Sequence, residues 1–140
     1  MITEAQYFGQ WRYAPDVTAQ ILSSAQLFLA RVNGLMASAK FKGVEFKMNP
    51  VTKSQISGAE YGGFRPIGCP IGAPGSAHKL GRAVDIFDPL GEIDAWCMKN
   101  TEPGGLLAMH EIYIEDPDHT PHWSHWTNRK PVSGNRVFHP

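Results

Sequence analysis

Two groups of residues in this sequence could hold a metal ion, and the first lies in the stretch 76–86. His78 is placed on a loop, and Asp85 follows it inside an apolar run. Apolar neighbours on both sides should put the Asp85 side chain in or at the surface of a sheet, where an unpaired carboxylate is costly. Asp85 should therefore have a cation, an arginine or a metal beside it. Gly81 would let the backbone turn so that His78 and Asp85 converge.

The second group lies in the late segment that contains His119, His122 and His125. Strand alternation places His125 and Trp123 on one face, with His122 and Ser124 on the other. A third ligand from this strand would complete a His/Asp/His set, which suits a catalytic zinc site with an open position for water. Each pattern alone has an ordinary alternative, namely a chance pair or a solvated loop. The two together favour the metal site.

The elements that must position these residues can be predicted from periodicity. Residues 17–40 carry apolar side chains at helical spacing, with Asp16 as a possible N-cap, and should form an amphipathic helix that covers one face of a sheet. Residues 58–76 are rich in glycine and proline, and a loop of this length is typically functional or disordered. We further expect irregular structure over 1–15, strands over 44–47, 53–57, 83–87, 106–115 and 122–127, a helix over 92–99 and a polar tail over 128–140.

Composition limits the class of protein. The chain has 140 residues and 13 Lys+Arg against 13 Asp+Glu, for a formal net charge of zero. This argues for one domain, residues 1–140, and against a nucleic-acid binder or a polybasic membrane-surface protein. No run approaches the ~20 apolar residues of a membrane-spanning helix. Cys69 and Cys97 could form one bridge or remain free thiols.

The first group also resembles a known family. Ser76-x-His78-x-x-Gly81-Arg82-Ala83-Val84-Asp85 closely matches the SxHxxGxAxD motif of the zinc D-Ala-D-Ala carboxypeptidase and L-alanyl-D-glutamate endopeptidase family. These murein peptidases belong to the LAS group, which includes the hedgehog signalling domain. Their third zinc ligand is a late histidine in a WxH pattern, which Trp123-Ser124-His125 resembles. The resemblance implies Zn²⁺ held by His78, Asp85 and His125.

The resemblance also implies a role for an upstream arginine. The family has a Ser-Gly-x-Arg segment whose arginine binds substrate or stabilises the oxyanion. Ser57-Gly58 followed by Arg65 is similar, but with several glycine-rich residues inserted. We expect Arg65 to hold a substrate carboxylate or the oxyanion. The alternative is a structural arginine whose guanidinium pairs with Asp85 or another buried acid.

The resemblance to the family does not assign the general base in this sequence. Many members have Glu or Asp three residues before the last ligand, whereas this sequence has His122. We expect Glu115 to be the base, because a hairpin between its strand and 122–127 would bring it beside the Trp123–His125 face. His122 is the next candidate, followed by Asp116 and Asp118. His110 and His119 should be structural or solvated.

We therefore expect an α+β, LAS/hedgehog-like fold with a small, mainly antiparallel sheet, the long helix on one face and the zinc cleft on the other. The expected activity is hydrolysis of an amide bond in bacterial peptidoglycan stem peptides by a monomer that neither binds nucleic acid nor inserts into a membrane. The first residues do not show the pattern of a signal peptide. We therefore expect a protein made in the cytoplasm that acts on the cell wall, either as a phage or prophage endolysin released through a holin or as a virion component. The alternative function is a catalytically inactive, zinc-stabilised binding module of the hedgehog type.

Overall fold

A four-stranded sheet forms the centre of the computed structural model, which describes all 140 residues. The strands are β1 (Ala83–Phe87), β2 (Tyr113–Glu115), β3 (Trp123–Thr127) and β4 (Val137–Phe138), in the spatial order β1-β3-β2-β4. β3 is antiparallel to both neighbours, whereas β2 and β4 are parallel. The α+β class is confirmed. The sheet is mixed because β4, a strand that was not predicted within the polar tail, pairs parallel to β2.

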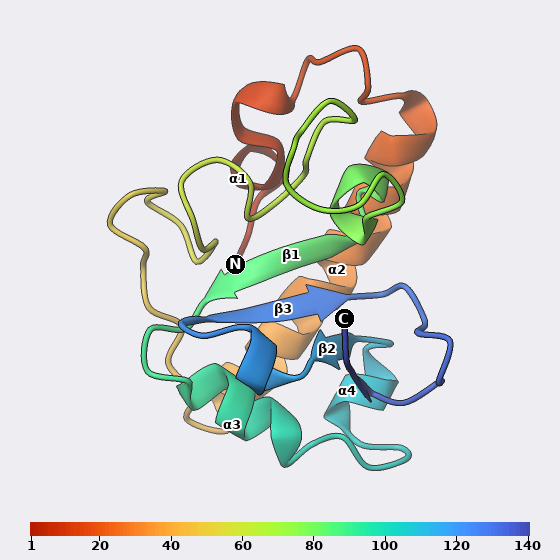
Figure 1. Cartoon of the computed structure of the whole chain (residues 1–140). Coiled ribbons are helices and arrows are strands. Elements are labelled where there is room, and N and C mark those ends of the chain that lie inside the picture. The colour runs from red at the N-terminus through yellow and green to blue at the C-terminus, as the bar shows by residue number, and fades with distance from the viewer.

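The long helix α2 (Ala19–Phe41) crosses behind the sheet in Figure 1 and covers one of its faces. Its buried side chains share a core with Val84 and Ile86 of β1 and Trp126 of β3. The predicted helix is confirmed, but its N-cap is Thr18, whose Oγ1 accepts from the Ile21 amide. Asp16, the predicted cap, accepts from the Ile67 amide instead.

The smaller helices lie around this core. Over residues 1–15, predicted to be irregular, Thr3 starts a short helix with a capping box. The predicted helix after residue 91 is confirmed with slightly different bounds. No helix is both long and apolar enough to cross a bilayer. The helices are α1 (Glu4–Phe8), α3 (Glu92–Met98) and α4 (Leu106–Met109), and the 3₁₀ helices are η1 (Gly9–Trp11), η2 (Ala77–Leu80) and η3 (Pro117–His119).

Three predicted strands are wrong in whole or in part. Residues 44–47 form no strand, and 53–57 contributes only isolated bridges. The predicted strand 106–115 is the helix α4 followed by the short β2, separated by Glu111 at a φ of 53°. A short apolar run does not distinguish a strand from a helical turn, and here Leu107 packs in the core from a helical turn. The loop 58–76 is confirmed as lacking helices and strands.

Candidate metal centre

Three strands place polar side chains in a row on the face of the sheet opposite α2. Asp85 of β1 lies across from His125 of β3 in the antiparallel register. The register between β2 and β3 pairs Ile114 with Trp126, so Glu115 lies one step on, at the level of His125. Because Ile114 and Trp126 are buried in the core, their neighbours Glu115 and His125 point to the opposite face. Sequence alternation predicted the face of His125 correctly.

The third residue, His78, reaches this face from the 3₁₀ helix η2. Gly81 ends η2 in the left-handed region, with a φ of 70°. A Cβ at this position would lie 2.9 Å from the carbonyl oxygen of Ile21 in α2. The glycine is therefore required both by its backbone conformation and by the close approach of α2. It turns the chain from η2 into β1, as the sequence predicted.

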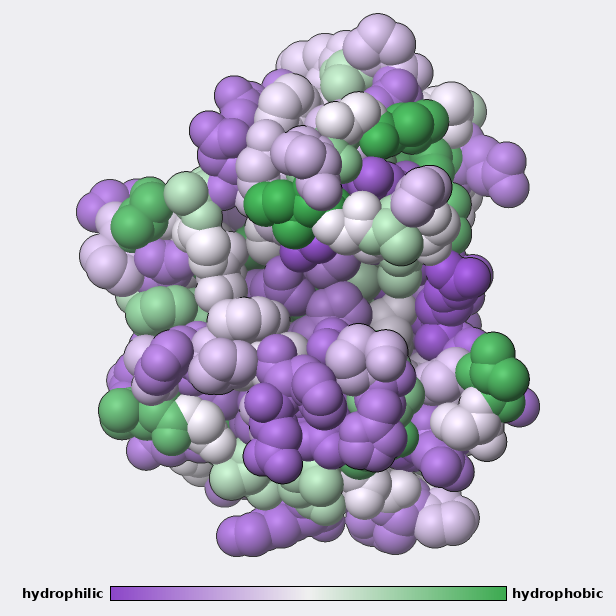
Figure 2. Space-filling view, in the orientation of Figure 1, coloured by the Kyte–Doolittle hydropathy of each residue, from purple (hydrophilic) through white to green (hydrophobic).

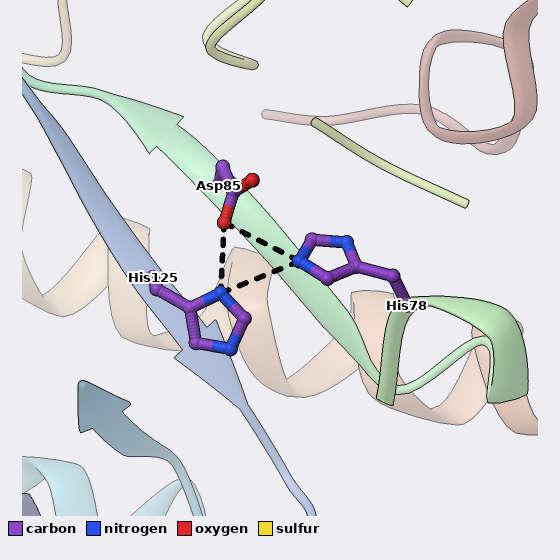
Figure 3. Close-up of side chains that lie close together, drawn as sticks. All are labelled: His78, Asp85 and His125. Atoms are coloured by element: carbon purple, nitrogen blue, oxygen red, sulfur yellow. Dashed lines mark hydrogen bonds and ion pairs between the residues drawn. The ribbon is translucent and has the colours of Figure 1, made fainter. Parts of the chain in front are cut away.

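His78, Asp85 and His125 converge, as Figure 3 shows. Asp85 Oδ1 lies 2.8 Å from His125 Nδ1 and 3.4 Å from His78 Nε2. The two histidine nitrogens are 3.3 Å apart. All three ligand atoms fall within 4.8 Å of one another, so one metal ion could contact them together.

The surroundings of His78 set its protonation. Its Nδ1 lies 2.7 Å from the carbonyl oxygen of Gly63, which can only accept a hydrogen bond. The proton is therefore on Nδ1, and the lone pair of Nε2 faces Asp85 and His125. Burial lowers the pKa of His78, which favours the neutral form that binds a metal. A carbonyl that orients a ligating histidine in this way is common at metal sites.

Gly63 was missed as a contributor to the site, because nothing in the sequence distinguished it from the other glycines of its loop. A Cβ at Gly63 would lie 2.1 Å from the carbonyl oxygen of Tyr7. The same carbonyl accepts a 3.0 Å hydrogen bond from the Phe64 amide. The N-terminal segment thus holds the loop that orients His78.

Arg65 pairs with the carboxylate of Asp85. Its Nη2 lies 2.9 Å from Asp85 Oδ2, and its Nε donates to the Tyr61 carbonyl oxygen at 2.7 Å. Burial would raise the pKa of Asp85, but the charge and hydrogen bonds that His78 and His125 supply once they are protonated hold this pKa well below its usual range. One carboxylate oxygen thus faces the histidines and the other faces the arginine. Arg65 is thus paired with Asp85, as expected if it is a structural arginine.

The three residues lie in a cavity of about 910 Å³. Figure 2 shows the surface hollowed near the centre of the view, with hydrophilic residues in the hollow. Arg65, Glu115 and Trp123 also line this cavity, and its outer wall comes from the C-terminal segment 129–140. Glu115 is half-buried, and burial, together with the charge of Asp85, raises its pKa.

The other candidate residues lie elsewhere. His122 does not line the cavity, and its Nδ1 lies 3.3 Å from the carbonyl oxygen of Pro89. Its φ of 74° breaks the alternation that would continue β3 backwards. Asp118 is exposed at the surface, and His110 lies with its Nε2 3.2 Å from Ser38 Oγ. The remaining candidate for the general base, Asp116, caps η3 and pairs with His139. Cys69 and Cys97 are both buried and form no disulfide.

The donor set fits a zinc ion. Two imidazole nitrogens and one carboxylate oxygen are ligands that Zn²⁺ accepts, and three protein ligands leave a position open for water or substrate. The tautomer of His78 leaves its metal-facing nitrogen unprotonated, as coordination requires. Comparison with protein-family models, curated proteins and solved structures found no match to this chain. The function of the chain must therefore be inferred from its own residues and from the geometry of the cavity.

Proposed function

We propose that this chain is a zinc peptidase that hydrolyses an amide bond in bacterial peptidoglycan stem peptides. The observation that carries the proposal is the convergence of His78, Asp85 and His125 in an open cavity, with Glu115 beside them. The similarity of the segment 76–85 to the motif of the murein peptidases supports the substrate class. We extend the proposal to an LAS/hedgehog-like fold in which the cavity is the substrate cleft.

The positions of the side chains suggest a catalytic role for each residue. A bound Zn²⁺ would supply Lewis acidity toward the scissile carbonyl and lower the pKa of water. His78, Asp85 and His125 would hold the ion. Glu115 lies at the level of His125 in the adjacent strand, where it can take a proton from the attacking water and donate it to the leaving amine. Burial raises its pKa from the ordinary value of a glutamate, which is the direction that suits a group exchanging protons.

Arg65 would have a double role in this scheme. Its ion pair holds Asp85 Oδ2 and so leaves Oδ1 directed toward the histidines. Because the guanidinium also lines the cavity, it could contact a substrate carboxylate. We expect the pairing with Asp85 to dominate, since both side chains are largely buried.

Digestion of purified muropeptides, followed by mass spectrometry, tests the proposal and identifies the bond. The zinc-loaded chain should release fragments whose masses correspond to one cleaved amide, and a chelator should abolish the release. His125→Ala should lose the zinc ion of the His78/Asp85/His125 centre together with the activity. A chain that binds zinc stoichiometrically yet cleaves no stem peptide would instead favour the hedgehog-type binding module.

The biological setting is part of the same proposal. A murein peptidase of a phage or prophage would act on the cell wall after release through a holin, or during entry as a virion component. Lysis of outer-membrane-permeabilised bacteria by added protein, measured as loss of turbidity, tests the cell-wall target. Failure to lower turbidity with protein that cleaves isolated muropeptides would contradict a lytic role.

A further inference from the structure

A second group of metal-binding side chains lies at the edge of the cavity. Asp116, His119 and His139 each offer one ligand atom, and these atoms all lie within 4.8 Å of one another. His139 also lines the cavity. We propose that these three residues form a second site for a divalent transition-metal ion such as Zn²⁺, separate from the His78/Asp85/His125 centre.

Local backbone structure brings Asp116 and His119 together. Asp116 is the N-cap of the 3₁₀ helix η3 and His119 is its last residue, and the period of about three residues places positions 116 and 119 on the same side. Asp116 Oδ1 accepts from the amide of Asp118 at 2.9 Å. This hydrogen bond fixes the carboxyl group and leaves Oδ2 to face His139.

The sheet brings His139 to the same place. The parallel pairing of β2 with β4 sets Glu115 beside Phe138, and the Asp116 amide donates to the Phe138 carbonyl oxygen at 2.8 Å. His139 follows directly, with its Nδ1 3.2 Å from Asp116 Oδ2. The His119 ring lies across from it, with the ring centroids 6.0 Å apart. The ligands thus come from two segments fixed to one another by backbone hydrogen bonds.

The chemistry of the group favours a metal over a simple ion pair. Two imidazoles and one carboxylate are a donor set for Zn²⁺ and for other first-row divalent ions. An ion pair between Asp116 and the exposed His139 would add little stability and would not require His119. A metal ion would require all three, which makes the two interpretations experimentally distinct.

An ion at this site would hold one wall of the cavity. Val137, Phe138 and His139 line the cavity, and Glu115 immediately precedes Asp116. The ion would link the turn after β2 to the end of β4, and so restrain the C-terminal wall beside the proposed general base. The second site has this structural role and does not depend on peptide hydrolysis.

Metal counting on the full, untagged chain tests the proposal. Metal-free protein is equilibrated with excess Zn²⁺, dialysed and analysed for zinc per chain, and the titration is repeated by competition with a chromophoric chelator. His119→Ala, His139→Ala and His125→Ala are compared with His122→Asn, a matched histidine control outside both groups. Zinc-induced shifts of the ring resonances of His119 and His139 in the His125→Ala variant provide a second readout.

We expect two zinc ions per wild-type chain and two in His122→Asn. One ion should remain in each of the three alanine variants, and none in a chain carrying both His125→Ala and His139→Ala. One ion per wild-type chain that is unaffected by His119→Ala and His139→Ala would overturn the second site and leave the first intact. Two ions that persist in His119→Ala and His139→Ala would also overturn it. An unchanged count in His125→Ala would refute the first site instead.

Discussion

Glu115 shows how burial and strand register together select one acid among several. Among the candidate bases, Glu115 lines the cavity beside His125, whereas Asp118 is exposed at the surface. A glutamate at the level of a metal-ligating histidine can reach water bound at the open coordination position. The register thus favours Glu115 over His122, which lies against the carbonyl of Pro89.

Replacement of Glu115 by glutamine should lower kcat by about 100-fold or more, the usual effect of losing a general base. Zinc content should stay at the wild-type value, because Glu115 is not a ligand in the proposed centre. Steady-state cleavage of muropeptides and zinc analysis of the same preparation provide the measurement. Glu111→Gln, an exposed residue paired with Arg31, is the matched control. Near-wild-type kcat in Glu115→Gln would contradict the assignment.

Arg65 provides a second test at the residue scale, because its guanidinium balances a largely buried carboxylate. Arg65→Ala should destabilise the metal-free protein by about 1–3 kcal/mol, since Asp85 loses its charged partner. Zinc should restore part of this loss by replacing the missing positive charge. Thermal unfolding with and without zinc measures the effect, with Arg12→Ala, which breaks the more exposed ion pair with Glu4, as control. An unchanged Tm with a raised KM would favour a purely substrate-binding arginine.

At the scale of elements, the turn between η2 and β1 decides whether His78 meets Asp85. Gly81→Ala should destabilise the fold by about 1–3 kcal/mol, because it adds strain at a positive φ and a contact with the backbone of α2. Gly104→Ala separates these effects, since Gly104 has a φ of 76° but no atom within 4 Å of an added Cβ. Urea unfolding should show a clearly smaller loss for Gly104→Ala. Equal losses would mean that the α2 contact contributes nothing.

The packing of α3 against β3 predicts a pH dependence. Asp94 of α3 is buried, its Oδ1 has no hydrogen-bond partner, and burial raises its pKa to about 6. Between an unfolded-state pKa of about 4 and this value, the folded chain binds a proton that the unfolded chain has released. Stability from this group therefore falls as pH rises toward 6, and stays reduced above it.

Asp94→Asn should accordingly raise the Tm relative to wild type at pH 8, by an amount that corresponds to about 1–2 kcal/mol. The difference should shrink as the pH is lowered from 6 toward 4, where the wild-type carboxyl is protonated in the folded state. Differential scanning calorimetry over this range is the measurement, with the exposed Asp118→Asn as the control for lost charge. A difference that is constant with pH would exclude the titration of Asp94 as its cause.

At the scale of the whole molecule, the proposed zinc ion would connect η2, β1 and β3, and it would therefore stabilise the native state. A ligand present at about 1,000 times its Kd adds about 4 kcal/mol to the free energy of unfolding. A chelator should lower the Tm of the wild-type chain, and the decrease should be smaller in His125→Ala. The same decrease in both proteins would show that the stabilising ion binds elsewhere.

The sequence alone was sufficient for the elements whose signals are local. The apolar spacing of residues 17–40 predicted α2, and the β-like run around Asp85 predicted β1, because a helix or strand with one buried face carries its period in the chain. Gly81 and the alternation around His125 likewise predicted how these residues present their side chains. These features depend on near neighbours, so they can be recognised without knowing the fold.

Only the tertiary structure decided the rest, because the deciding contacts join distant segments. The pairing of Arg65 with Asp85 and the carbonyl of Gly63 at His78 depend on how the loop 58–76 lies against β1. The two-residue strand β4 exists because it pairs with β2, and no local pattern in the polar tail predicts it. The approach of His139 to Asp116 follows from that pairing. Short polar segments take their structure from their partners, and the partners are known only once the chain has folded.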